Sequence, residues 1–89
     1  MTDPTPERLR FPCDYPIKVL VRADPGVREQ VDMIVRHHAG PIASESVSER
    51  SSAQNRFLGI TYLIHARDEA HIAALFGALK SCPQVLMVL

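Results

Sequence analysis

The chain has 89 residues, of which 46% are hydrophobic and 22% are charged. This composition is typical of one small folded domain and argues against a disordered chain. Ten Lys and Arg residues balance ten Asp and Glu residues. The balance argues against nucleic acid as a partner, because proteins that follow a phosphate backbone carry an excess of positive charge.

The chain also lacks the sequence features of membrane and secreted proteins. No apolar run approaches the about 20 residues that a membrane-spanning helix needs, and residues 1–6 are polar, unlike a signal peptide. We therefore expect a cytoplasmic protein that does not bind a membrane. Cys13 and Cys82 precede strands that we expect to be antiparallel neighbours, so they lie too far apart for a disulfide and stay reduced.

The first half of the chain predicts an arm, a strand and a helix. Residues 1–14 contain three prolines and predict a flexible N-terminal arm, followed by a single domain over residues 15–89. Residues 16–23 alternate between apolar and polar side chains, which predicts a strand. Asp24 is a candidate N-cap and Pro25 a candidate first residue of a helix, which Gly40-Pro41 ends. Asp32 and Arg36 are spaced to form an ion pair on its exposed face.

The second half predicts three more elements and a short loop. Residues 42–50 are weakly apolar and partly charged, as in an edge strand. Residues 51–55 suit a hairpin loop, and residues 56–66 form the strongest strand pattern. A second helix begins at Arg67 or Asp68 and ends at Cys82-Pro83, and residues 85–89 form the last strand.

The order βαββαβ predicts an α+β, ferredoxin-like fold. Its four-stranded antiparallel sheet has the order 4-1-3-2, with both helices on one face. The predicted core between helices and sheet consists of Ile17, Val19, Val21, Val31, Ile34, Val35, Ile60, Tyr62, Ile64, Ile72, Leu75, Phe76, Leu79, Val85 and Met87.

The opposite face of the predicted sheet carries large apolar side chains that are unfavourable in water. We expect a second copy of the chain, in a homodimer, or another protein partner to cover this face. The predicted interface residues are Leu20, Phe57, Leu63, Leu86 and Val88.

The turn after the first strand is the candidate ligand site. Amide groups at the N-terminus of a helix can bind a small anion, which makes Arg22, Asp24, Pro25 and Gly26 candidates for binding a small effector. Helix capping explains the same residues without a ligand. The histidines lack convergent partners for a metal, and no serine or cysteine has a basic partner, so we expect no cofactor, no metal and no catalytic residue.

Two alternative functions remain open. An acylphosphatase-like hydrolase would need an arginine and a water-positioning group in one pocket, for which Arg22 and Asn55 are candidates. A single-stranded RNA binder would need aromatic residues on the exposed faces of strands one and three. The third strand offers Phe57, but the first strand offers Leu20 and no aromatic residue.

The ordered segments Phe11-Pro12, Ile17-Lys18-Val19, Val35–Ala39, Ile64-His65-Ala66 and Val85–Leu89 resemble the YbeD-like family of small bacterial proteins. The resemblance implies a ferredoxin-like domain similar to ACT regulatory modules, which bind amino acids or other small effectors. Asp24-Pro25-Gly26-Val27 resembles the turn of ACT domains but is one residue shorter. The leading hypothesis is therefore a non-enzymatic regulatory or interaction module that acts in trans.

Overall fold

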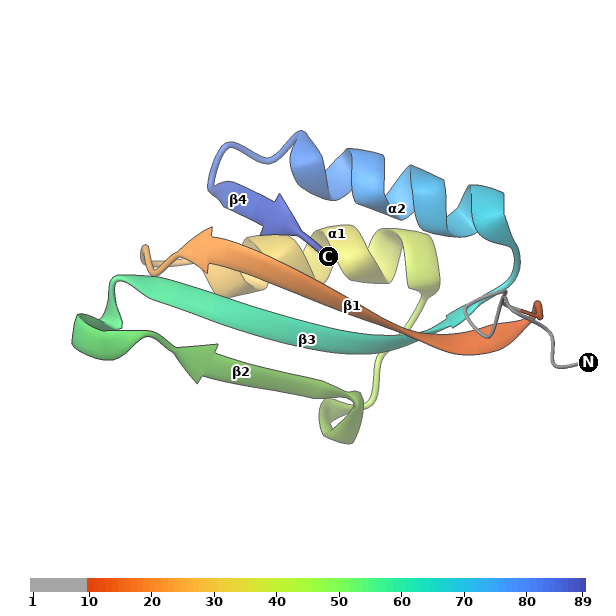
Figure 1. Cartoon of the computed structure of the whole chain (residues 1–89), viewed down its shortest axis with the longest axis horizontal. Helices are drawn as coiled ribbons and strands as arrows, with labels where there is room; N and C mark the ends of the chain where they lie inside the picture. Colours follow the sequence, from red (N-terminus) through yellow and green to blue (C-terminus); the bar gives the residue numbers. More distant parts are fainter. Residues whose placement is uncertain (1–9) are drawn as a thin grey trace, which may run out of the picture.

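The structure, a computed structural model, describes residues 10–89 and contains one sheet and two α-helices (Figure 1). The predicted arm falls mostly on residues 1–9, which lie outside the described residues. The sheet order β2-β3-β1-β4 confirms the predicted 4-1-3-2 arrangement. The elements in chain order are β1 (Cys13–Arg22), α1 (Val27–Ala39), β2 (Val47–Ser51), β3 (Phe57–Ala66), α2 (Glu69–Lys80) and β4 (Val85–Val88), with short 3₁₀ turns at Ser44–Ser46 and Ala53–Asn55.

The long central pair of β1 and β3 organises the sheet. The two strands are antiparallel and in register from Cys13 opposite Ala66 to Arg22 opposite Phe57. The odd-numbered positions of β1 and the even-numbered positions of β3 point toward the helices and are buried or partly buried, as the alternation predicts. Both helices contribute to this same cluster, which places them on one face of the sheet. The buried cluster consists of Ile17, Val19, Val21, Val27, Val31, Val35, Ile60, Tyr62, Ile64, Ala66, Leu75, Leu79 and Val88.

The last strand differs from the prediction because of a β-bulge. Leu20 lies opposite Met87, but the next residue of β1, Val21, lies opposite Val85. The extra residue shifts the side-chain alternation, so the predicted faces of Met87 and Val88 are both wrong. Val88 is buried in the core rather than at the open interface, and Met87 is 50% exposed rather than in the core.

The start of α1 also differs from the prediction. The residue before the helix is Gly26, with a φ of 79°, and no side chain caps the first turn. The prediction of Asp24 as N-cap is therefore wrong: its carbonyl oxygen accepts a hydrogen bond from Val27 N–H at 3.2 Å. A left-handed φ carries little steric cost in glycine, which lets the chain turn before the helix. The helix ends at Gly40, as predicted.

The predicted strand over residues 42–50 is shorter in the structure. Its first half forms the 3₁₀ turn, in which Ser46 N–H donates to the Ala43 carbonyl oxygen at 2.9 Å. The turn satisfies locally a backbone group that a strand would pair with β3. Strand β2 therefore begins only at Val47, opposite Tyr62.

Strand β4 covers only part of the β1 edge. Lys18 and Leu89 exchange two backbone hydrogen bonds, of 2.9 and 2.8 Å, so the even-numbered residues of β1 direct their backbone groups toward β4. Pro16 is the preceding residue of this set and has no N–H. On the other side of β1, Pro16 lies opposite Leu63 of β3, but within residues 10–89 no strand pairs with it on the β4 edge. Proline there leaves no unpaired donor.

A polar network joins β2, α1 and β3. The hydroxyl group of buried Tyr62 donates to the Asp32 carboxylate, which also accepts a hydrogen bond from Arg28 Nε at 3.0 Å. Arg28 donates a further hydrogen bond to the Glu49 carboxylate. The predicted pairing of Asp32 with Arg36 is therefore wrong, because the sheet supplies two groups that hold Asp32 and Arg28 together. Burial, followed by the hydrogen bond to Asp32, raises the pKa of Tyr62 well above its ordinary value.

We expect the stability of the protein to fall as the pH rises above about 10, where an unfolded tyrosine loses its proton. The folded state keeps the Tyr62 proton in this range, so the unfolded state binds fewer protons and its free energy falls relative to that of the folded state as the pH rises. Urea unfolding at several alkaline pH values measures this slope. Tyr62→Phe removes the contribution of Tyr62, whereas Tyr15 is present in both proteins, so the variant should have a shallower slope. Equal slopes would contradict the assignment of the pH dependence to Tyr62.

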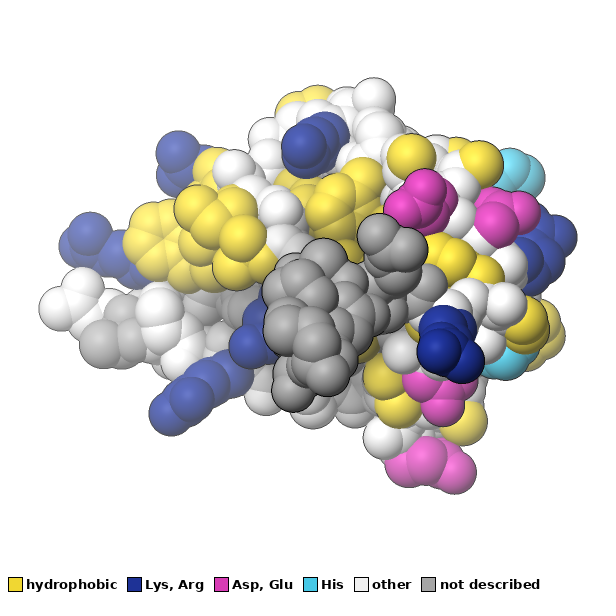
Figure 2. Space-filling view, turned by 45° about the vertical axis from the view of Figure 1, so that its right-hand side comes forward, with side chains coloured by type: hydrophobic (Ala, Val, Ile, Leu, Met, Phe, Trp, Pro, Cys, Tyr) yellow, Lys and Arg dark blue, Asp and Glu magenta, His cyan; other side chains and the backbone are white. Residues whose placement is uncertain are grey.

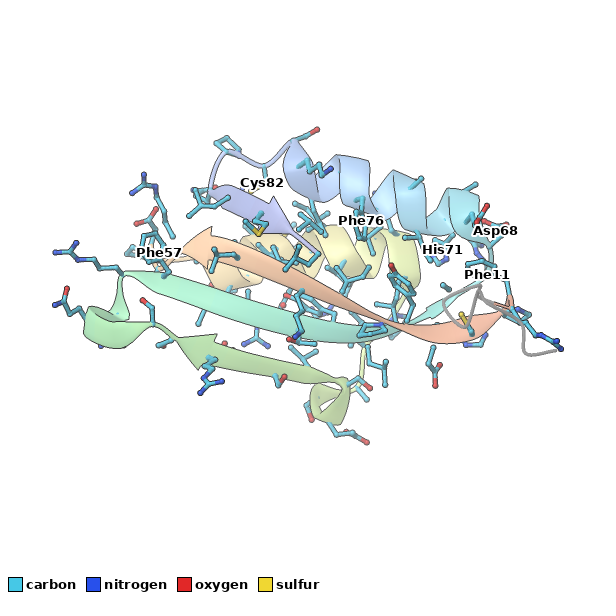
Figure 3. The ribbon with its side chains drawn as sticks, viewed as in Figure 1. Phe11, Phe57, Asp68, His71, Phe76 and Cys82 are labelled. Atoms are coloured by element: carbon cyan, nitrogen blue, oxygen red, sulfur yellow. The ribbon has the colours of Figure 1, made fainter. Side chains whose placement is uncertain are left out.

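A buried histidine fixes the N-terminal end of α2 (Figure 3). The Asp68 carboxylate accepts a hydrogen bond from His71 N–H at 2.8 Å and caps the helix, which begins at Glu69, one residue after the predicted start. His71 Nδ1 accepts from Arg67 N–H at 3.1 Å, and Nε2 lies 2.6 Å from the carbonyl oxygen of His38. These contacts require the tautomer with hydrogen on Nε2. The ring therefore connects the end of α1 to the start of α2.

We expect His71→Leu to lower the free energy of unfolding by about 1–3 kcal/mol, because it leaves two backbone groups without partners. His37→Leu is the matched control, since His37 is exposed on α1 and should change stability little. Thermal and urea unfolding measure both variants. Equal stability of the two would show that the His71 contacts contribute nothing.

Candidate functional site

The face of the sheet that the helices do not cover is the candidate functional site, and we call it the open face. The pairing of β1 with β2, β3 and β4 identifies the residues whose side chains share this face. No helix of residues 10–89 packs on it, since both helices belong to the cluster on the other side. The open face comprises Asp14, Pro16, Lys18, Leu20, Arg22, Ser48, Arg50, Phe57, Gly59, Thr61, Leu63, His65, Met87 and Leu89.

Large apolar side chains are exposed on and beside this face. Their exposed fractions range from 36% at Leu20 to 65% at Leu89. The prediction placed Leu20, Phe57 and Leu63 on this face, as in the structure, and missed Met87 and Leu89. Leu86, also predicted here, is exposed at the bulge of β4 beside the face. The role of these residues as an interface stays a prediction. Figure 2 shows hydrophobic side chains gathered next to Lys and Arg side chains on the surface that it presents. A concentration of this kind is typical of interaction surfaces.

The charge on the open face is asymmetric although the chain as a whole is neutral. Lys18, Arg22 and Arg50 lie on it, all exposed. The acidic residue among its members is Asp14, whose carboxylate lies at the far end of β1, 3.4 Å from His65 Nδ1. The central and β2-side parts of the face are therefore basic.

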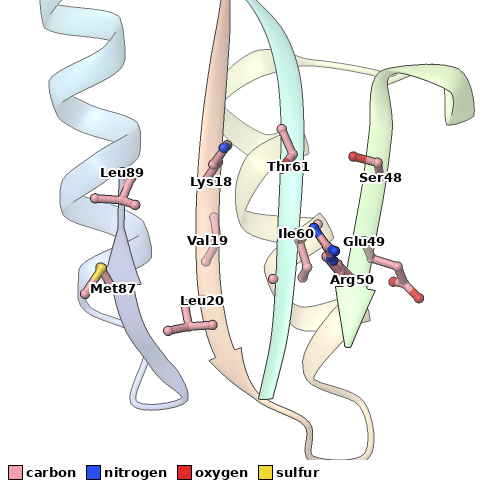
Figure 4. A pocket seen from close by; sticks show the side chains of 11 residues that line it. Lys18, Val19, Leu20, Ser48, Glu49, Arg50, Ile60, Thr61, Met87 and Leu89 are labelled. Atoms are coloured by element: carbon pink, nitrogen blue, oxygen red, sulfur yellow. The ribbon is translucent and has the colours of Figure 1, made fainter. Parts of the chain in front are cut away.

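A hollow of about 550 Å³ lies at the centre of the open face (Figure 4). Leu20, Met87 and Leu89 line it on the side of β1 and β4, and Arg50 and Ser48 line it on the side of β2. Lys18 and Thr61, which lie opposite each other in β1 and β3, also line it. Glu49 is at its edge, but its carboxylate accepts the hydrogen bond from Arg28 on α1.

Gly59 creates the hollow because it lacks a side chain between Arg50 and Leu20, its neighbours in the sheet. A Cβ atom built there would meet a single neighbour, the Arg50 carbonyl oxygen at an ordinary 3.7 Å. Neither backbone conformation nor crowding therefore requires glycine. Glycine in a strand interior weakens the strand, so fold stability alone does not explain the residue.

We expect Gly59→Val to be as stable as the natural chain or more stable, by up to about 1 kcal/mol, because valine favours a strand. Urea unfolding measures the difference. Gly26→Val is the comparison, and it should be destabilised because its φ of 79° strains a branched side chain. A large loss of stability in Gly59→Val would show that the fold itself needs the hollow.

The structure keeps the predicted ligand turn together but gives it no enclosure. Arg22, Asp24, Pro25 and Gly26 follow one another in an exposed turn, and none of them lines the hollow over Gly59. Arg22 pairs with Phe57 at the end of the open face. Effector binding at this turn stays a prediction.

The part of the chain that the structure describes contains no organised site for a metal ion or for thiol chemistry. No three His, Cys, Asp or Glu side chains converge there. Cys13 and Cys82 are free thiols, and Cys82 is buried. Neither helix of residues 10–89 is long and apolar enough to cross a bilayer.

The structure also shows where the candidate residues for the two alternative functions, hydrolysis and RNA binding, lie. Asn55 lies in the 3₁₀ turn before β3, with a φ of 55°, and neither it nor Arg22 lines the hollow. Phe57 is exposed at the end of β3, while Tyr15 and Tyr62 point to the helix side. As far as the structure describes it, the open face thus presents two aromatic rings, Phe57 and His65, which lie toward opposite ends of β3 and cannot stack neighbouring bases together.

The comparison with protein families decides where the chain belongs. Residues 6–89 match the family model described as "Protein of unknown function (DUF493)". The chain belongs to this family. The match confirms the resemblance to YbeD-like proteins. A UPF0250 protein of Hahella chejuensis is 41% identical over all of both chains, and a UPF0250 protein of Pseudomonas paraeruginosa is 38% identical over 98% of this chain and 95% of its own.

Solved structures with the same arrangement extend the comparison to fold. Protein HP0495 from H. pylori is 12% identical and superposes with a TM-score of 0.76, over 98% of this chain and 91% of its own. The ACT domain of a GTP pyrophosphokinase from Chlorobium tepidum is 13% identical, with a TM-score of 0.60 over 86% and 97%. At such low identity these likenesses establish the ferredoxin-like, ACT-like fold alone.

Proposed function

We propose that the protein is a non-enzymatic regulatory module that binds a partner protein through the open face of its sheet. The observation that carries the proposal is the combination on that face of exposed leucine and methionine side chains with Lys18, Arg22 and Arg50. Protein interfaces place apolar anchors at their centre and enrich methionine and arginine. The hydrophobic effect supplies the affinity, and the cations orient the partner.

Charge favours a different protein over a second copy as the partner. A two-fold dimer packs one patch against the same patch of its copy. Self-association of the basic part would place Lys18, Arg22 and Arg50 near their own equivalents, with Asp14 the acidic group on the face. A partner with an acidic and apolar surface matches both features.

Two observations support the regulatory role: the side chains that line the hollow of the open face, and the fold. Its hollow is lined by apolar, basic and hydroxyl side chains and by Glu49, whose carboxylate is hydrogen-bonded to Arg28 rather than to a hydroxyl group. The ACT domain of the GTP pyrophosphokinase is an example of the same fold as a separate unit of a larger protein.

We expect a photo-crosslinking amino acid at Leu20 to capture a partner in living cells. Leu20 is central on the open face, while Met33 is 68% exposed on α1 and serves as the matched position. Expression of the two labelled chains in the source bacterium, followed by irradiation and mass spectrometry, compares them. A covalent adduct with one other protein at Leu20, without that adduct at Met33, supports the proposal.

The charge requirement is checked in the same cells. Arg50→Glu in the Leu20-labelled chain should reduce the adduct, because it reverses a cation of the open face. An adduct with the mass of two copies would replace the proposed partner by a homodimer. The same adducts at both positions, or none at Leu20, would contradict docking on this face.

A further inference from the structure

We infer that the hollow over Gly59 is an anchor site for one apolar side chain of an acidic peptide segment, whose neighbouring carboxylate is bound by Lys18 and Arg50. This inference rests on the proposed function and names the chemistry of its partner. The relevant segment has Asp or Glu beside a Leu, Ile, Met or Phe. The anchor enters the hollow, and the carboxylate lies at its basic side.

The shape of the hollow supports an apolar anchor. Its volume of about 550 Å³ lies within the range of small-ligand pockets, and it is open enough for a side chain to enter from solvent. Leu20, Met87 and Leu89 form one continuous apolar wall, contributed by the β1–β4 pair. The floor is the backbone at Gly59, where every other residue type would place a side chain.

The charges around the hollow support a carboxylate beside the anchor. Lys18 on β1 and Arg50 on β2 both line the hollow, on either side of β3 (Figure 4). Glu49, the acidic residue in the lining, has its carboxylate hydrogen-bonded to Arg28. Ser48 and Thr61 add two hydroxyl groups. A guanidinium, an ammonium and two hydroxyls form a donor set suited to a carboxylate.

The same geometry disfavours single-stranded RNA. Phe57 and His65 are the aromatic residues of the open face among residues 10–89, and neither lines the hollow. A base bound over Gly59 would therefore have no ring to stack on, whereas stacking supplies much of the affinity of single-stranded nucleic acid.

The experiment selects peptides from a displayed library of random linear sequences on the full chain, with counter-selection on Gly59→Val. The valine places a branched side chain on the floor of the hollow and removes no other side chain of the open face. We expect enrichment of an acidic residue next to a large apolar residue. Enrichment of basic or purely polar sequences would overturn the inference, as would peptides that bind Gly59→Val equally well.

Affinity measurements on the enriched peptide then separate the two contributions. Fluorescence anisotropy should give a weakening of about tenfold or more for Arg50→Ala, the loss of one charge-assisted contact. Arg56→Ala is the matched control, because Arg56 is exposed outside the hollow lining, and it should bind within about twofold of the natural chain. Equal weakening by both variants would mean that Arg50 attracts the peptide only through its charge, without a specific contact. That result would contradict the proposed carboxylate site.

The Leu20 cross-link distinguishes failure of this inference from failure of the proposed function. If the cellular adduct persists in Gly59→Val, the open face still docks a partner but the hollow is not its anchor. If the adduct is lost in Gly59→Val, while unfolding confirms a folded chain, the anchor is supported. Salt-dependent binding of single-stranded RNA that Phe57→Ala abolishes would replace the peptide by a nucleic acid.

Discussion

The one-sided packing of the helices is the constraint on which the rest of the molecule depends. In β1 and β3 successive side chains point to opposite faces, so the residues that complete the core also determine what the other face presents. Because α1 and α2 both bury their apolar faces against one side, Leu20, Leu63 and their neighbours have no intramolecular cover within residues 10–89. An exposed apolar surface with basic side chains is the direct consequence, and both proposals follow from it.

Alternation in the two central strands was predictable from the sequence because it is a local signal. The pattern in β3 identified Ile60, Tyr62 and Ile64 as buried and Phe57 and Leu63 as exposed, and the structure agrees. The order of strand-like and helix-like segments likewise predicted the sheet topology. These features depend on periods of two and about 3.6 residues, which a sequence displays directly.

Features that depend on contacts between distant residues were not predictable in this way. The bulge in β4 depends on how that strand pairs with β1, and it reverses the faces of Met87 and Val88. Asp32 pairs with Arg28 because Tyr62 and Glu49 approach from the sheet. The hollow over Gly59 combines residues of all four strands of the sheet. A glycine at an outward position of the strongest strand was nevertheless a signal that could have pointed to it.

Oxidation of two exposed methionines tests the central claim most directly. Met87 lies on the open face and Met33 on α1, with exposed fractions of 50% and 68%. Brief treatment with dilute peroxide, in intact cells of the source organism and with the purified chain, followed by peptide mass spectrometry, measures both rates. If a partner covers the open face, Met87 should be protected in cells relative to the purified chain while Met33 is oxidised equally in both. Equal oxidation of Met87 in the two settings would contradict the account.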